Sequence, residues 1–159
     1  MKILVICGCK NTGKTTLMSF LIEKLSKKGY KVGTIKHDGH DFDSDIEGRD
    51  STLHYQSGAR QAAVFSKNRW MMIENQAMSL ENIMTYFQNN DILLIEGCKN
   101  SRYPKIEMLR KGYQEIPVSC PENRLALVSD FYLECHELVL DVHNKNQILE
   151  FVEEYIKKV

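Results

Sequence analysis

The sequence lacks a net charge, because 21 lysines and arginines balance 21 acidic residues among its 159 positions. This balance gives no overall electrostatic case for binding nucleic acid or an anionic membrane surface. No stretch reaches the ~18 consecutive apolar residues needed to cross a bilayer, and the apolar start at residues 2–7 is too short for a signal peptide. We therefore expect a soluble, cytoplasmic protein that binds neither nucleic acid nor a membrane.

The sequence also lacks CxxC spacing, and its five cysteines are an odd number. Both facts argue against a disulfide framework and a zinc site, so reduced thiols are expected. There is no internal repeat, low-complexity tract or linker. The length is typical of one domain that buries roughly 70% of its unfolded surface, so residues 1–159 are predicted to form a single domain.

The beginning of the chain has the pattern of a βαβ unit. Residues 2–7 form a short apolar run that ends at Gly8, which is typical of a strand buried on both faces. Residues 14–28 carry apolar side chains at helical spacing and end before Gly29. Residues 31–35 then resemble a second strand, which predicts two parallel strands with a right-handed crossover.

The rest of the chain continues the mixture of helices and strands. Helices are predicted over 51–57, after a cap at Ser79, and over 146–157. Strands are predicted over 61–66, 69–73, 91–97, 105–109, 124–128 and 138–140. The expected fold class is α/β, with a mostly parallel sheet flanked by helices in three layers.

The segment from Gly8 to Thr15 matches the phosphate-loop pattern GxxxxGK[ST]. It lies between a buried strand and a helix N-terminus, so its main-chain N–H groups can surround an anion at the positive end of the helix. The alternative, a chance glycine-rich turn, does not account for this context. Together with the predicted strands and helices, this loop indicates a three-layer P-loop NTPase domain with a mostly parallel sheet. The predicted ligand is a purine nucleoside triphosphate with Mg²⁺. The loop residues predicted to bind it are Gly8, Asn11, Thr12, Gly13, Lys14 and Thr15.

Two of these side chains have distinct expected roles. Lys14 is predicted to bridge the β- and γ-phosphates, and the Thr15 hydroxyl to ligate Mg²⁺. Glu96 follows four apolar residues, and parallel strands end at one edge of a sheet, so it is the predicted second metal anchor. The alternative is an acidic residue that caps a strand end. Asp91 is too far away, because five strand residues span about 17 Å.

The polar, acidic segment 37–50 is predicted to be a long functional loop that senses the γ-phosphate. Asp45 and Asp50 are the metal candidates, and Asp50 is favoured because Gly48 permits a turn before a helix. Asp45 to Gly48 also fits a DxxG pattern, which we discount because no apolar strand precedes it. A transition-metal site remains an alternative to a solvated loop; its ligands would be His37, His40, Asp41, Asp43 and Asp45.

Several motifs occur together in a characteristic order. They are the loop Gly8 to Thr15, Ile35-Lys36-His37-Asp38-Gly39-His40-Asp41, Gly48-Arg49-Asp50-Ser51 with Gly58-Ala59, Leu94-Ile95-Glu96-Gly97-Cys98-Lys99, and Lys105-Ile106-Glu107. From residue 3 to about 130 the chain resembles the molybdopterin-guanine dinucleotide biosynthesis protein B family, MobB. One departure is Cys98, where the family often has an aromatic residue.

The resemblance implies a GTP-binding protein, with weak GTPase activity at most, that assists the guanylyltransferase joining GMP to molybdopterin. It also implies a homodimer. Carried over by position, Gly13, Lys14, Thr15 and Thr16 bind phosphates, Glu96 and an acidic residue of 37–50 bind Mg²⁺, and Lys99 with Lys105 lies near the ligand.

The guanine-reading motif NKxD is absent, because Asn144-Lys145-Asn146-Gln147 lacks the final aspartate. Ser129 and Asp130, at a predicted strand end, are therefore the best candidates for reading the base. The alternative function is a small-molecule kinase or ATP-dependent ligase, which the same loop and Glu96 also fit. Arg102 and Arg110 are candidates for a kinase, but residues 98–123 lack the paired arginines expected on one helix.

Overall fold

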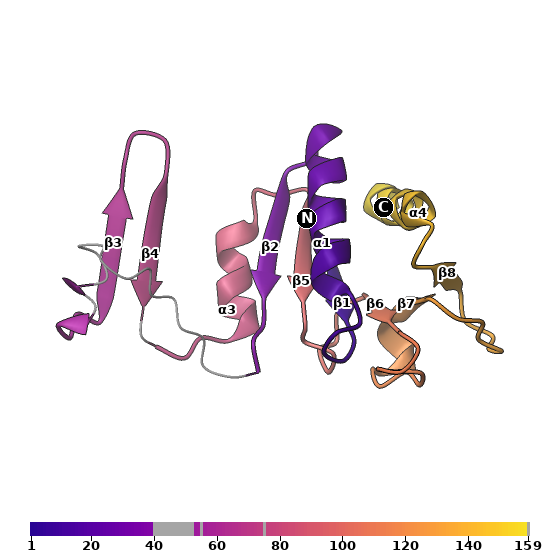
Figure 1. Ribbon diagram of the computed structural model, residues 1–159. Helices are drawn as coiled ribbons and strands as arrows, with labels where there is room; N and C mark the ends of the chain where they lie inside the picture. Colours follow the sequence, from indigo (N-terminus) through magenta and orange to yellow (C-terminus); the bar gives the residue numbers. More distant parts are fainter. Residues whose placement is uncertain (40–52, 55, 75, 159) are drawn as a thin grey trace. The chain divides into compact units, whose positions relative to one another are not determined.

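The structure, a computed structural model, describes residues 1–39, 53–54, 56–74 and 76–158 (Figure 1). The chain forms two compact units, one of Met1–Asp38 with Phe87–Val159 and one of Gly39–Tyr86. This division into compact units does not test whether residues 1–159 fold as one domain, which stays a prediction.

The larger unit is built on a six-stranded sheet in the order β2-β5-β1-β6-β7-β8. Every pairing in this sheet is parallel. The strands are β1 (Lys2–Cys7), β2 (Val32–Lys36), β5 (Ile92–Glu96), β6 (Lys105–Met108), β7 (Arg124–Ser129) and β8 (Val139–Asp141). The predicted α/β class with a mostly parallel sheet is confirmed.

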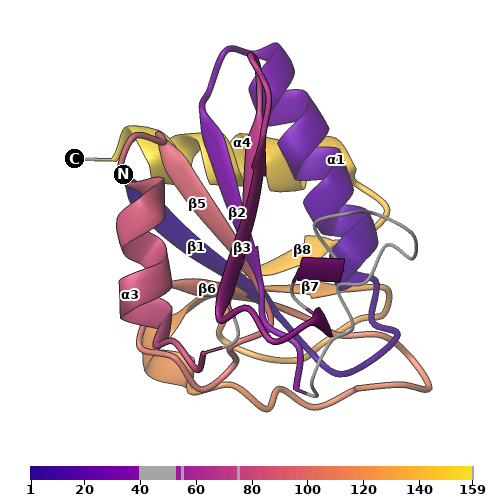
Figure 2. The same ribbon diagram turned by 90° about the vertical axis from the view of Figure 1, so that its left-hand side faces the viewer.

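One face of this sheet is covered by two helices, α1 (Lys14–Lys27) and α4 (Lys145–Lys157). Figure 2 shows both helices on the same side of the strands. Alternate strand residues such as Leu4 and Ile6 point to this side and share one buried cluster with Leu21 of α1 and Val152 of α4. Burial of this apolar face stabilises the unit by about 25 cal/mol per Å² of apolar surface. It also holds α1, which follows the loop after β1, against the sheet.

Both helices have clear start or stop signals. Asn144 precedes α4, and its side chain accepts a hydrogen bond from the main-chain N–H of Gln147 at 3.2 Å. Gly29 follows α1 with a φ of 91°, a left-handed conformation that glycine adopts without strain. Such a helix end suits the short turn that leads into β2.

The smaller unit contains an antiparallel hairpin of β3 (Gln61–Phe65) and β4 (Trp70–Glu74), which confirms both predicted strands. Among the residues that the structure describes, these strands pair with each other and with no further strand, and Phe65 lies opposite Trp70. The helix α3 (Leu80–Met84) begins after Ser79, whose side chain accepts from the N–H of Asn82 at 3.2 Å, as the sequence predicted. Short 3-10 turns lie at Thr85–Phe87 and Pro121–Asn123.

None of the helices in the described part of the chain is long and apolar enough to span a bilayer.

Candidate nucleotide-binding site

The phosphate loop follows β1, which lies at the centre of the sheet between β5 and β6. The chain passes from β1 to β2 on one side, whereas β6, β7 and β8 lie on the other. The strand order therefore reverses at β1, and α/β proteins bind ligands beyond the carboxyl ends of the strands at such a point. The loop is thus in the position where the sheet topology creates a binding crevice.

Two glycines permit the conformation of this loop. Gly8 has a φ of 138°, and a Cβ atom there would lie 2.6 Å from the carbonyl oxygen of Met108. Gly13, the residue before α1, has a φ of 93°. These conformations curl the chain into the start of α1, where the described residues provide no side-chain cap, so the first N–H groups of the helix are available to an anion.

The main-chain carbonyl of Cys9 connects the beginning of the loop to residues near its end. Its oxygen accepts from Lys14 Nζ at 2.6 Å and from Thr12 Oγ1 at 2.9 Å. Thr12 is buried, whereas Lys14 is only half-buried. The Lys14 ammonium therefore lies over the loop, where a phosphate can replace the carbonyl oxygen as its partner.

The two predicted metal anchors are brought together. Thr15 Oγ1 donates to Glu96 Oε1 at 3.0 Å, although 81 positions separate them in the sequence. Glu96 ends β5 and is 8% exposed. A hydroxyl and a carboxylate oxygen are hard ligands of the kind that Mg²⁺ takes alongside phosphate oxygens and water. The pair fits Mg²⁺, although the described residues contain no group of three His, Cys, Asp or Glu side chains suited to a metal.

Other predicted residues have different surroundings. Asp50 and most of the loop 37–50 lie outside the described residues. Thr16 is exposed at the start of α1, and Lys99 is exposed three residues after Glu96. Lys105 is fully buried in β6, where its ammonium donates to the carbonyl oxygen of Ser101.

A pocket of about 230 Å³ adjoins the phosphate loop. Its lining combines apolar side chains with Arg110, Asp130 and His143, and includes Thr12, Gly13 and Thr16 of the loop and α1. Asp130 is exposed, and its Oδ1 accepts from the N–H of Lys111 at 2.8 Å. Ser129 is 3% exposed and its hydroxyl bonds the main chain of Phe131, so Asp130 presents the polar group here.

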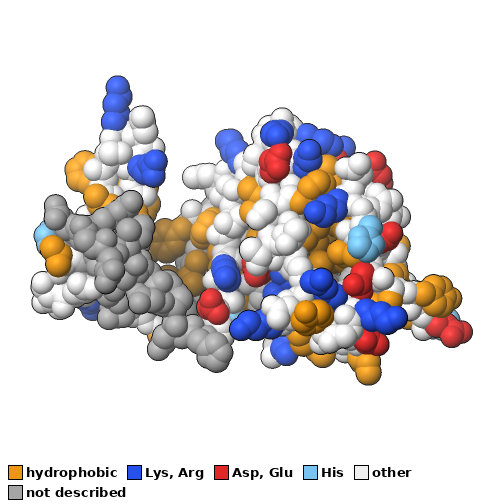
Figure 3. Space-filling model, viewed as in Figure 1, with side chains coloured by type: hydrophobic (Ala, Val, Ile, Leu, Met, Phe, Trp, Pro, Cys, Tyr) orange, Lys and Arg blue, Asp and Glu red, His pale blue; other side chains and the backbone are white. Residues whose placement is uncertain are grey.

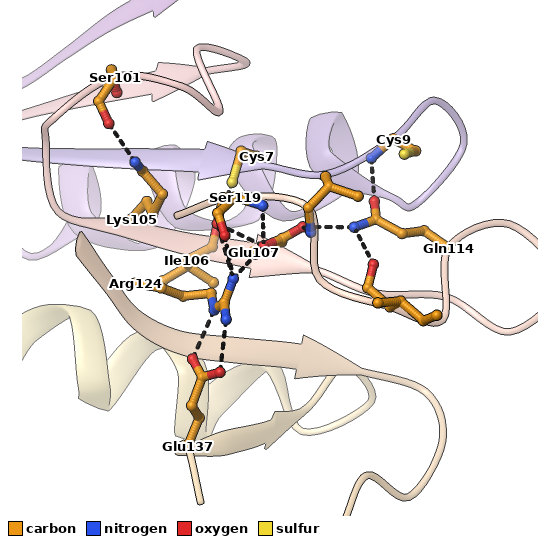
Figure 4. Close-up of polar contacts among 12 residues, drawn as sticks. Cys7, Cys9, Ser101, Lys105, Ile106, Glu107, Gln114, Ser119, Arg124 and Glu137 are labelled. Carbon is orange, nitrogen blue, oxygen red and sulfur yellow. Dashed lines mark hydrogen bonds and ion pairs between the residues drawn. The ribbon is translucent and has the colours of Figure 1, made fainter. Parts of the chain in front are cut away.

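Sequence reasoning missed a buried polar cluster next to the loop (Figure 4). At its centre, Glu107 of β6 is fully buried and forms an ion pair with Arg124 at 3.0 Å. Gln114 Nε2 and Ser119 Oγ also donate to the carboxylate of Glu107, each at 2.6 Å. The signal that pointed to it was the acidic residue in an apolar strand, since a buried carboxylate requires donors.

Burial and hydrogen bonding act oppositely on Glu107. Burial acts to raise the pKa of this carboxyl, but the donors Ser119, Val118 and Gln114 together hold it below its ordinary value of 4.5. Beside it, burial followed by the charge of Glu107 raises the pKa of the Cys7 thiol to about 11. Cys7 is therefore a neutral, buried strand residue, and none of the five cysteines, all of which lie in the described part of the chain, is in a disulfide.

The family was established by comparison with known proteins. The profile of the family described as Molybdopterin guanine dinucleotide synthesis protein B, MobB, matches residues 3–130. The chain belongs to the MobB family. This confirms the resemblance that the motifs predicted.

Known MobB proteins are similar along nearly the whole chain. The molybdopterin-guanine dinucleotide biosynthesis adapter protein of Escherichia coli K12 is 31% identical over 164 residues, which cover 98% of this chain and 94% of that protein. The adapter protein of Haemophilus influenzae is 30% identical over 158 residues, covering 97% and 89%. The crystal structure of Bacillus subtilis MobB matches all of both chains with a TM-score of 0.81 and 25% identity.

Proposed function

We propose that this MobB-family chain is a GTP-binding adapter that assists the guanylyltransferase making the molybdopterin guanine dinucleotide cofactor. The observation that carries this proposal is the family match over residues 3–130, together with relatives named as adapter proteins of this biosynthesis. It favours the adapter over the kinase or ligase alternative, which has no such support. Hydrolysis of GTP is weak at most, and the protein acts in the cytoplasm.

The proposed ligand is GTP with Mg²⁺. The N–H groups of the loop and the ammonium of Lys14 bind the phosphates, with Gly8, Asn11, Thr12, Gly13 and Thr16 shaping or contacting that site. Mg²⁺ is bound by Thr15 and Glu96, with Asp50 as the proposed third residue. The hydrogen bond between Thr15 and Glu96 supports this assignment, because a bound cation can take both oxygens as ligands.

Asp130 is the proposed reader of guanine, with Ser129 supporting it and Lys99 near the ligand. A carboxylate can accept from both the N1–H and the exocyclic amine of guanine, whereas adenine offers no such pair. The location of Asp130 in the pocket beside the loop supports this role. Asn144, by contrast, is engaged as the cap of α4.

We expect Asp130→Asn to reduce the preference for GTP over ATP by roughly tenfold. The substitution replaces one of the two carboxylate oxygens by an NH₂ group, which donates and cannot accept from guanine. The control is Asp141→Asn, since Asp141 also caps a turn at a strand end but does not line the pocket. Competition titrations of both variants measure the ratio. An unchanged GTP preference in Asp130→Asn assigns base reading elsewhere.

The chain is also proposed to form a homodimer through the β3–β4 hairpin. An isolated two-stranded hairpin is marginally stable in water. This one leaves Phe65 85% and Trp70 64% exposed, and Figure 3 shows hydrophobic side chains on its visible face.

Co-purification with the guanylyltransferase tests the adapter role. We expect the enzyme to be retained by the wild-type chain in the presence of GTP and Mg²⁺, and to be retained less by Lys14→Ala under the same conditions. A coupled assay with ATP and candidate small-molecule acceptors is the second arm. Rapid substrate-dependent phosphoryl transfer, with no retention of the enzyme, would reject the adapter in favour of a kinase.

A further inference from the structure

The turn formed by residues 110–114 contacts the phosphate loop at two points. The N–H of Cys9 donates to Gln114 Oε1 at 2.5 Å, and Arg110 Nη1 donates to the carbonyl oxygen of Asn11 at 3.1 Å. Two main-chain hydrogen bonds of 2.9 Å between Arg110 and Gln114 close the turn. The turn is therefore a compact unit that is hydrogen-bonded to the phosphate loop at Cys9 and Asn11.

The orientation of the Gln114 side chain is fixed by its surroundings. Gln114 is 6% exposed, and its Nε2 donates to Glu107 Oε1 at 2.6 Å and to the carbonyl oxygen of Ile116 at 3.1 Å (Figure 4). Rotating the amide by half a turn would direct its oxygen at two acceptors and its NH₂ group at the N–H of Cys9. Only one orientation satisfies all three partners.

Cys9 transmits this constraint to the residues that contact phosphate. Gln114 binds the N–H of Cys9, while the carbonyl oxygen of Cys9 accepts from Thr12 and Lys14. A chain of hydrogen bonds thus leads from the buried carboxylate of Glu107 through Gln114 to Lys14. Each member fixes the position of the next before any ligand arrives.

We propose that Gln114 is a positioning residue that holds the phosphate loop in its binding conformation. The proposal rests on the proposed nucleotide function of the loop. Gln114 does not touch the phosphates in this role; it prevents the loop from relaxing, so that less conformational entropy is lost on binding. The ligand class is the triphosphate of a nucleotide, irrespective of its base.

The first test compares Gln114→Ala with Ser119→Ala. Both variants remove one donor to Glu107, but only Gln114 reaches the phosphate loop. In the protein without nucleotide, we expect the N–H of Cys9 to exchange with solvent roughly tenfold faster in Gln114→Ala than in the wild type, and at the wild-type rate in Ser119→Ala. Nuclear magnetic resonance measures that exchange.

Affinity for GTP with Mg²⁺ gives the second readout. We expect it to fall roughly fivefold to tenfold in Gln114→Ala and to stay at the wild-type value in Ser119→Ala. Equal exchange of Cys9 in Gln114→Ala and wild type overturns the positioning role. If the wild-type protein binds no nucleotide, the proposed function is wrong. The exchange rate of the Cys9 N–H then still shows whether Gln114 holds the loop.

The variant Gln114→Glu gives a pH profile that a purely structural role would not produce. Glu107 of β6 contacts this side chain, Arg124 of β7 pairs with Glu107 on its other oxygen, Cys7 of β1 is a neutral thiol beside Glu107, and Arg110 shares the turn of Gln114. Near neutral pH the new carboxylate repels Glu107, so the exchange of Cys9 should be fast. At lower pH a neutral carboxyl can donate to Glu107 and accept from Cys9, as the amide does.

We therefore expect the exchange of Cys9 in Gln114→Glu, relative to wild type at the same pH, to slow toward the wild-type rate as the pH falls. A ratio that stays constant over the pH range argues against the role. This variant also replaces Gln114→Ala as the test if the alanine protein does not fold.

Discussion

Glu107 is a fully buried carboxylate that keeps its charge. Its donors are Gln114, Val118, Ser119 and Arg124. Burial acts to raise the pKa of this carboxyl, but the hydrogen bonds from Ser119, Val118 and Gln114 hold it below the ordinary 4.5, so the unfolded chain binds this proton more readily than the folded chain. The resulting stability is present above the unfolded pKa and is lost as pH falls through the folded value.

Glu107→Gln should lower the free energy of unfolding by about 3 kcal/mol at neutral pH, because it breaks the buried ion pair with Arg124, which then keeps only the more exposed Glu137 as a charged partner. The difference from wild type should shrink as the pH falls below 4.5, because the unfolded wild-type chain then binds a proton at this carboxyl more readily than the folded chain does. Urea unfolding at both pH values measures this. Glu137→Gln, which alters the more exposed partner of Arg124, is the control with a smaller effect. Equal stability of Glu107→Gln and wild type at neutral pH would contradict the account.

Single residues differed in how well the sequence predicted them. The spacing of the loop motif and the position of Glu96 after an apolar run were sufficient to anticipate the contact between Thr15 and Glu96, because strand ends in a parallel sheet share an edge. The partners of Glu107 were not anticipated. Gln114 and Ser119 come from an irregular segment whose path is set by tertiary contacts, and periodicity carries no information on such a path.

At the scale of elements, the helices and strands follow from periodicity, since each has an apolar pattern and polar or glycine boundaries. The βαβ start, the hairpin and the Ser79 cap were predicted with ends within a residue or two of those observed. The strand order was not predicted. The placement of β6 beside β1 depends on tertiary packing, which the apolar pattern of a single strand does not reveal. The pocket at Asp130 depends on that order and could not be located beforehand.

The phosphate loop gives a prediction with a matched control. Gly8→Ala would place a Cβ atom 2.6 Å from the carbonyl oxygen of Met108, so the loop must shift. Affinity for GTP with Mg²⁺ should fall by on the order of a hundredfold, as expected from two lost charge-assisted hydrogen bonds. Isothermal titration measures this loss.

The control is Gly29→Ala, which also adds a methyl group at positive φ but meets no atom within 4 Å. It should cost about 1 kcal/mol of stability and leave nucleotide affinity unchanged. Equal affinities in the two variants would show that the conformation of Gly8 is irrelevant to binding.

At the scale of the whole molecule, the chain divides into two compact units, and the smaller contains the exposed hairpin. Its hydrophobic residues were assigned to strands correctly from the sequence, yet their exposure was not predicted, because alternation alone does not reveal whether a partner covers a strand. Large apolar side chains left in water favour association.

We expect the double variant Phe65→Ser and Trp70→Ser to shift the protein from dimer to monomer, because it removes two large apolar side chains from the proposed contact. Light scattering after size-exclusion chromatography measures the mass. Tyr132→Ser, which alters an 89% exposed aromatic residue of the larger unit, is the control and should leave the dimer intact. A wild-type protein that is monomeric at all concentrations would contradict the proposed homodimer.

The most direct test of the account is calorimetric titration of the wild-type chain and Lys14→Ala with GTP and with ATP, each with and without Mg²⁺. The wild type should bind GTP more tightly with Mg²⁺ than without it, and more tightly than it binds ATP. Lys14→Ala should lose this binding while keeping the wild-type unfolding temperature, because the ammonium is only half-buried and contacts one carbonyl oxygen. Wild-type affinity in Lys14→Ala would show that the phosphate loop is not the nucleotide site.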